Sequence, residues 1–187
     1  MRGMSFALRL HAPMVLPCDP GCSVIRDAVV DIDEDGRIAY CGPRTEAPER
    51  PHDGDVRECG GILMPGLINA HAHSPMTLLR GMGGDLPLLR WLREVIWPAE
   101  ARLRPSDIRA GMELGCVEML RAGVTTSAEM YFDGEAVVDA ALAVGSRVVY
   151  GAAVIATPEL DKLGGWQGLV DNMSRWIDAD GLRFGPG

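Results

Sequence analysis

The pattern of apolar and polar residues changes character near residue 60. Before that point, alternating or β-branched stretches predict short strands, at 5–11, 24–32 and 37–41. Asp35 and Gly36 lie between the last two stretches and predict a hairpin turn, because glycine readily adopts the positive φ that such turns need. Residues 1–60 therefore predict a small domain built from strands, and the domain that follows starts at residue 61.

After residue 60, strand-like and helix-like patterns alternate, and the run 62–68 is apolar enough to predict a strand buried on both faces. The expected strands are 62–68, 124–132, 147–155 and a segment starting at 182; the expected helices are 86–103, 105–121, 135–144 and 166–177. Pro98 must kink or break the first of these helices. Such alternation predicts βα units on a parallel sheet, and four strands are half of the eight that close a barrel.

Composition and charge exclude some classes of protein. The chain has 187 residues, 47% of them hydrophobic and 24% charged, as in ordinary globular proteins. A net charge of -8 argues against a nucleic-acid partner, which needs a basic surface. The first ten residues do not resemble a signal peptide, and no run reaches the roughly 18 apolar residues of a membrane span. We therefore expect a cytoplasmic protein without a membrane partner.

Two histidines directly follow the apolar run 62–68. Residues two apart in a strand point to the same face, so His71 and His73 can offer two imidazoles to one metal ion. Parallel barrels carry their active sites at the carboxyl ends of their strands. A bare His-x-His also arises by chance, but this position favours a divalent metal site, with zinc as the first candidate and iron as the second.

The sequence around the histidines resembles that of a known family. The matching segments are 63–73 (Leu-Met-Pro-Gly-Leu-Ile-Asn-Ala-His-Ala-His), 75–81, 85–88, 91–92 and Gly-Val-Thr-Thr at 123–126, leading into Tyr131. Together they are similar to the amidohydrolase superfamily, in the branch of the 5-methylthioadenosine/S-adenosylhomocysteine deaminases and triazine hydrolases. The resemblance covers essentially the whole chain.

The resemblance implies an α/β fold and a metal-dependent reaction. Family members join a distorted TIM (β/α)₈ barrel to a small β-sandwich, so 1–60 would be the N-terminal part of the sandwich and 61–187 the first half of a truncated barrel. A metal held by the His-x-His pair, a later His and an Asp supplies the hydroxide that attacks a ring carbon, while a Glu moves the proton. His71 and His73 match the first two ligands. The later residues are expected beyond Gly187, so no catalytic residue is expected within this chain.

Two further residues match substrate contacts of that branch. Glu100 matches a carboxylate that holds the ribose hydroxyls, although a helical glutamate is more often a solvated charge. Trp91 matches a residue that lines the substrate pocket, and core packing is its alternative. Ala152 stands where adenosine-type deaminases carry a substrate-contacting arginine, which weakens the case for a thioadenosine or homocysteine-bearing substrate. Gly187 stands where a substrate-contacting histidine is expected.

The resulting hypothesis is hydrolytic deamination, a C–N bond hydrolysis, of a nitrogen heterocycle such as an adenosine-type nucleoside. The alternative chemistries are a triazine or chlorohydrolase reaction and deamination of a guanine- or cytosine-type base. A rival of another class is a non-catalytic half-barrel, a fragment that only associates with a partner. The chain has four histidines and none remains for a third ligand, so we expect it to be inactive alone. The expected partner is a small heterocyclic substrate, and a homo-oligomer stays open.

Overall fold

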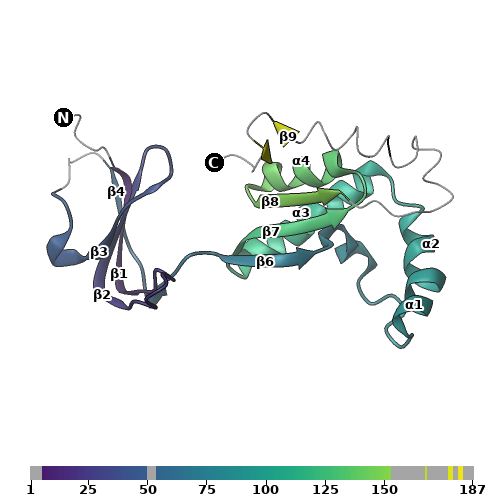
Figure 1. Ribbon diagram of the computed structural model, residues 1–187, viewed down its shortest axis with the longest axis horizontal. Coiled ribbons are helices and arrows are strands. Elements are labelled where there is room, and N and C mark those ends of the chain that lie inside the picture. Colours follow the sequence, from purple (N-terminus) through teal and green to yellow (C-terminus); the bar gives the residue numbers. More distant parts are fainter. Residues whose placement is uncertain (1–5, 50–53, 153–166, 168–176, 179–180, 183–187) are drawn as a thin grey trace. The chain divides into compact units, whose positions relative to one another are not determined.

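The computed structural model describes residues 6–49, 54–152, 167, 177–178 and 181–182 (Figure 1). The chain divides into two compact units, Met1–Pro65 and Gly66–Gly187. The assignment of these parts to a β-sandwich and a barrel domain with a boundary at 60/61 stays a prediction. Among the described helices, none combines the length and the apolar character needed to cross a membrane.

The N-terminal unit is a five-stranded sheet with the order β3-β2-β1-β4, in which β5 also pairs with β1. Its strands are β1 (Phe6–Val15), β2 (Ile25–Asp33), β3 (Ile38–Pro43), β4 (Asp55–Glu58) and β5 (Ile62–Leu63), with a 3₁₀ helix η1 (Arg44–Glu46) after β3. The predicted hairpin is confirmed between β2 and β3, where Gly36 has φ 76°. The Asp33 carboxylate accepts hydrogen bonds from the N–H groups of Asp35 and Arg37, which closes the turn.

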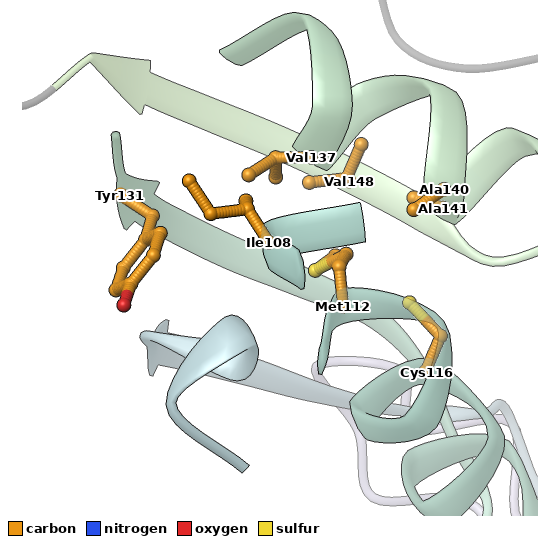
Figure 2. Close-up of a cluster of buried hydrophobic side chains, with 8 residues drawn as sticks. All are labelled: Ile108, Met112, Cys116, Tyr131, Val137, Ala140, Ala141 and Val148. Carbon is orange, nitrogen blue, oxygen red and sulfur yellow. The ribbon is translucent and has the colours of Figure 1, made fainter. Parts of the chain in front are cut away.

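The C-terminal unit contains a parallel sheet with the order β6-β7-β8. The strands are β6 (Leu67–Ala72), β7 (Val124–Tyr131) and β8 (Arg147–Ala152), and the helices α3 (Pro105–Arg121) and α4 (Gly134–Val144) lie beside them (Figure 1). Figure 2 shows the core between them, to which α3 contributes residues spaced four apart: Ile108, Met112 and Cys116. This spacing places one stripe of α3 against the sheet.

Local signals set the ends of these two helices where the sequence predicts them. Pro105 is the first residue of α3, a position where its missing N–H costs no hydrogen bond. Asp133 caps α4 by accepting a hydrogen bond from the Ala136 N–H. Both helices are followed by a glycine with φ 82°, Gly123 and Gly145.

The prediction of one buried strand at 62–68 is wrong. The run is divided at Pro65 and Gly66, so β5 pairs with β1 in the first unit and β6 pairs with β7 in the second. Proline cannot donate to a sheet ladder, which explains the break. The run is not buried either, since Ile62 is 58% and Ile68 71% exposed in this chain.

The helix predicted at 86–103 forms three consecutive pieces: α1 (Leu88–Trp91), a π-helical segment η3 (Leu92–Ile96) and α2 (Trp97–Glu100). Pro98 lies in the first turn of α2. The distortion expected at Pro98 therefore takes the form of a wider π-helical turn directly before it.

The end of the predicted βα series lies mostly outside the described residues, including almost all of the predicted helix at 166–177. Ile177, its expected last residue, belongs to the strand β9 (Ile177–Asp178). Leu182 is in a strand as predicted, but β10 (Gly181–Leu182) pairs antiparallel with β9 and is not a fourth parallel strand. Only two residues connect β9 and β10, whereas a parallel pair needs a long crossover.

Candidate active site

The two histidines of the predicted metal site meet at the carboxyl end of β6. His71 lies within β6, and His73 immediately precedes the 3₁₀ helix η2 (Ser74–Leu79). Their ring centroids are 4.8 Å apart and their ring planes are 83° from parallel. The pairing of β6 with β7 is irregular between Asn69 and Ala72, as in a bulge, which redirects the side chains around it.

A backbone carbonyl of the neighbouring strand holds the His73 ring. The His73 Nδ1 atom lies 2.6 Å from the carbonyl oxygen of Met130, at the end of β7. A carbonyl can only accept, so Nδ1 is the donor in this contact, and the lone pair that a histidine offers to a metal is then the one on Nε2. Histidines that bind metals usually have this arrangement, with one nitrogen on the metal and the other donating to a carbonyl or carboxylate.

This geometry fits half of a zinc site. Zinc sites usually have three or four protein ligands, and histidine is among the commonest. Within the described part of the chain, no group of three His, Cys, Asp or Glu side chains is placed to hold a metal ion. The five cysteines are free thiols, and Cys18 and Cys22 are exposed. The His71–His73 pair is thus the arrangement in the described chain that could contribute to a metal centre.

Sequence reasoning missed a buried glutamate beside the histidines. Glu129 on β7 is 2% exposed, and its carboxylate accepts a 2.9 Å hydrogen bond from the Ser74 N–H. The Ser74 hydroxyl donates to the other carboxylate oxygen. The sequence does contain a signal, a charged residue within the predicted strand 124–132, because glutamate is almost never fully buried unless it has partners.

Glu100, the last residue of α2, is half-buried and lies near the histidines. Burial raises the pKa of the Glu100 carboxyl, and the neighbouring Tyr131 hydroxyl and His73 ring oppose that increase. The Tyr131 hydroxyl is buried without a hydrogen bond of standard geometry among the described residues. Burial and then Glu100 raise the pKa of Tyr131 well above its usual range. The structure therefore brings Glu100 close to Tyr131 and His73.

Trp91 lies at a separate hollow of the same unit. The hollow has a volume of about 500 Å³, and its lining includes Met76, Leu79, the glycine-rich loop 81–84, Leu88 and Trp91. The indole N–H of Trp91 donates to the Met82 carbonyl oxygen at 2.7 Å. This hydrogen bond ties the Trp91 side chain to the glycine-rich loop that also lines the hollow. Met76 connects the two places, because its N–H donates to the His73 carbonyl oxygen.

The sequence pattern of the Amidohydrolase family matches residues 62–182. The chain belongs to the amidohydrolase family. It is 46% identical over 141 residues to the 5′-deoxyadenosine deaminase of Methanopyrus kandleri. These residues make up 74% of this chain and 33% of that relative. It is 43% identical over 148 residues to a 5-methylthioadenosine/S-adenosylhomocysteine deaminase of Symbiobacterium thermophilum, covering 79% and 34%. The chain thus spans about a third of the length of these amidohydrolases.

Solved amidohydrolase structures agree with the predicted fold class. An adenosine deaminase from Xanthomonas campestris with bound zinc is 31% identical and superimposes with a TM-score of 0.72, over 91% of this chain and 40% of that one. The atrazine chlorohydrolase of Arthrobacter aurescens complexed with zinc has a TM-score of 0.75 at 20% identity, over 92% of this chain and 44% of that one. At that identity the second likeness shows the fold alone. The α/β architecture is part of a TIM-type amidohydrolase barrel.

Proposed function

We propose that this chain supplies the first two metal ligands and part of the nucleoside site of an enzyme that hydrolytically deaminates adenosine-type nucleosides. The observation that carries the proposal is the His71–His73 pair, in which the Met130 carbonyl leaves the Nε2 atom of His73 free for a metal. The relatives that share 46% and 43% identity are deaminases of 5′-deoxyadenosine and of 5-methylthioadenosine/S-adenosylhomocysteine.

The metal that fits this pair is a divalent ion, and we favour zinc over iron. Imidazole suits both ions, and the adenosine deaminase and atrazine chlorohydrolase structures contain zinc. When bound, such an ion lowers the pKa of a coordinated water toward 7 and makes hydroxide available at neutral pH. Within the described chain His71 and His73 would hold the ion, and its remaining ligands would come from outside this part.

Glu100 is the candidate for holding the ribose. Its carboxylate is half-buried beside Tyr131 and His73, which supports a role in the site over a fully solvated helix charge. A carboxylate can accept hydrogen bonds from two hydroxyls, which suits the diol of a sugar. We assign Trp91 to the substrate-facing surface, because its ring lines the hollow next to η2 and it is not part of the core shown in Figure 2. A cytoplasmic location stays a prediction.

A chimera tests the proposed function. Residues 1–187 would replace the matching third of the Methanopyrus kandleri deaminase, and ammonia release would be measured with 5′-deoxyadenosine, adenosine, guanine and a triazine. We expect zinc-dependent release from the nucleosides, with loss of activity in His71→Ala and His73→Ala. A folded, zinc-loaded chimera that releases no ammonia from nucleosides would contradict the proposal.

The same chimera tests the role of Glu100, and the isolated chain tests whether ligands from outside it are needed. Glu100→Ala should reduce turnover of the nucleoside more than turnover of free adenine, because each hydrogen bond to a charged group contributes about 1.5–3 kcal/mol. Equal losses on both would exclude Glu100 as the sugar contact. The 187-residue chain by itself should release no ammonia, because the described residues offer two imidazoles to a metal and zinc sites usually have three or four protein ligands. Release from the isolated chain would show that the other ligands are not needed.

A further inference from the structure

The end of β6 is attached to β7 at two consecutive positions. Met130 accepts a hydrogen bond from His73 through its carbonyl oxygen, and Glu129 binds Ser74 through its carboxylate. His73 and Ser74 are adjacent, as are Glu129 and Met130. One contact orients the imidazole ring, and the other holds the backbone that carries it.

Glu129 suits this task because its carboxylate is buried and is occupied by Ser74. No described arginine forms an ion pair with Glu129; the side chain is 2% exposed and accepts one hydrogen bond from an N–H and one from a hydroxyl. A buried polar group without such partners would cost several kcal/mol, so the pairing with Ser74 strongly favours one position of the backbone at His73 and Ser74.

Helix α3 packs against the start of η2. A Cβ atom placed on Gly115 would lie 2.8 Å from the Ser74 Cβ, and one on Gly111 would lie 2.4 Å from the Pro75 carbonyl oxygen. The start of η2 at Ser74 and Pro75 therefore lies in direct contact with the α3 backbone. Ser74 thus contacts both α3 and the Glu129 carboxylate.

We propose that Glu129 is a positioning residue for the metal centre: through Ser74 it holds His73 in the orientation in which Nδ1 donates to Met130 and Nε2 is free for the metal. This inference rests on the proposed function, because it assumes that His73 is a ligand. Glu129 itself would touch neither the metal nor the substrate. Its removal should weaken metal binding without removing a ligand.

Zinc affinity of the purified 187-residue chain provides the first test, by equilibrium dialysis against zinc solutions of known concentration. Loss of a residue that orients a metal ligand typically weakens metal binding about 10–100-fold, and we expect a loss in that range for Glu129→Ala. Glu129→Gln can still accept from the Ser74 N–H and donate to its hydroxyl oxygen, so it should lose less than about tenfold. Ser74→Ala is a second route to the same loss if Glu129→Ala does not fold.

The matched control is Ser127→Ala. Ser127 lies two residues before Glu129 on β7, is fully buried, and its hydroxyl has no hydrogen-bond partner among the described residues. Its replacement should leave zinc affinity unchanged. A second readout is the tautomer of His73 in the metal-free chain, measured from imidazole ¹⁵N shifts. The wild type and Ser127→Ala should show the Nδ1–H form, and Glu129→Ala a mixture of both forms.

The outcomes separate this inference from the proposed function. If His71→Ala and His73→Ala leave zinc binding unchanged, both proposals are overturned. If those variants abolish binding while Glu129→Ala and Ser74→Ala bind zinc as tightly as the wild type, the positioning role alone is overturned. An equal loss in Glu129→Gln and Glu129→Ala would also overturn it, because the amide preserves the hydrogen bonds on which it depends.

Discussion

Each unit of the molecule buries a carboxylate, and the two are satisfied in different ways. In the N-terminal unit, Asp31 is fully buried and faces Arg9 directly across β1 and β2, with N–O distances of 2.6 and 2.7 Å. The same guanidinium also donates to the Pro48 carbonyl oxygen at 2.9 Å. In the C-terminal unit, Glu129 is almost as buried, but Ser74 supplies two uncharged donors.

The two carboxylates differ in what they hold together: Asp31 joins parts of the sheet, and Glu129 holds the segment that carries a proposed metal ligand. The Arg9–Asp31 pair joins two strands and the segment after η1, where the described residues show no metal-ligating cluster. Glu129 joins a strand to the loop that carries His73. A charge balanced by another charge depends on both partners, whereas a charge satisfied by neutral donors depends mainly on its hydrogen bonds. The two sites should therefore respond differently when only the charge is removed.

The largest contrast is expected between Asp31→Asn and Glu129→Gln. Asp31→Asn leaves the Arg9 side chain, only 12% exposed, without its counter-charge, and should lower the free energy of unfolding by about 3–5 kcal/mol. Glu129→Gln keeps both hydrogen bonds and exchanges charged for neutral ones, which should cost about 1 kcal/mol. Urea unfolding, with amide hydrogen exchange to resolve the two units, measures both changes.

A double variant provides the control for this contrast. Arg9→Met combined with Asp31→Leu removes the charged pair completely, and should recover most of the stability lost in Asp31→Asn, since apolar replacements of buried pairs are often neutral. Similar losses of unfolding free energy in Asp31→Asn and Glu129→Gln would show that the two carboxylates depend on their charge to the same extent, contrary to this prediction.

A smaller effect is expected where α3 contacts the start of η2 at Ser74 and Pro75. Alanine favours a helix over glycine by about 1 kcal/mol, yet Gly111→Ala places a methyl group against the Pro75 backbone, and overpacking costs about 1–3 kcal/mol. The net result should be a loss of up to about 2 kcal/mol in the thermal unfolding of the chain. The neighbouring exposed site serves as the control, where Ala110→Gly should show only the propensity loss of about 1 kcal/mol. Stabilisation by Gly111→Ala would mean that the loop is not held against α3.

The smallest effect is expected for Ser127→Ala. Because the buried Ser127 hydroxyl has no partner among the described residues, its removal should change the free energy of unfolding by no more than about 0.5 kcal/mol, or raise it slightly. Chemical denaturation beside the Glu129 variants measures the difference. A loss as large as that of Glu129→Gln would indicate a hydrogen-bond partner for Ser127 outside the described residues.

The sequence by itself determined the features that depend on neighbouring residues. Pro105 and Gly145 define a helix start and a helix end, Gly36 defines the hairpin turn, and the His71–His73 spacing predicts two imidazoles side by side. These signals act through backbone conformation over a few residues, so they remain valid without knowledge of the rest of the fold. The family resemblance extended that reading to Glu100 and Trp91.

Tertiary structure decided what depends on residues far apart in the chain. The run 62–68 has the composition of one strand, but its two halves pair with different strands, which hydrophobicity cannot predict. The meeting of Glu129 with Ser74 spans 55 positions, and that of Glu100 with Tyr131 depends on how α2 and β7 end near each other. Side chains at such separations are brought together by strand pairing and helix packing. The sequence therefore predicted His71 and His73 as a pair of ligands, and only the fold showed that the Met130 carbonyl contacts the His73 ring.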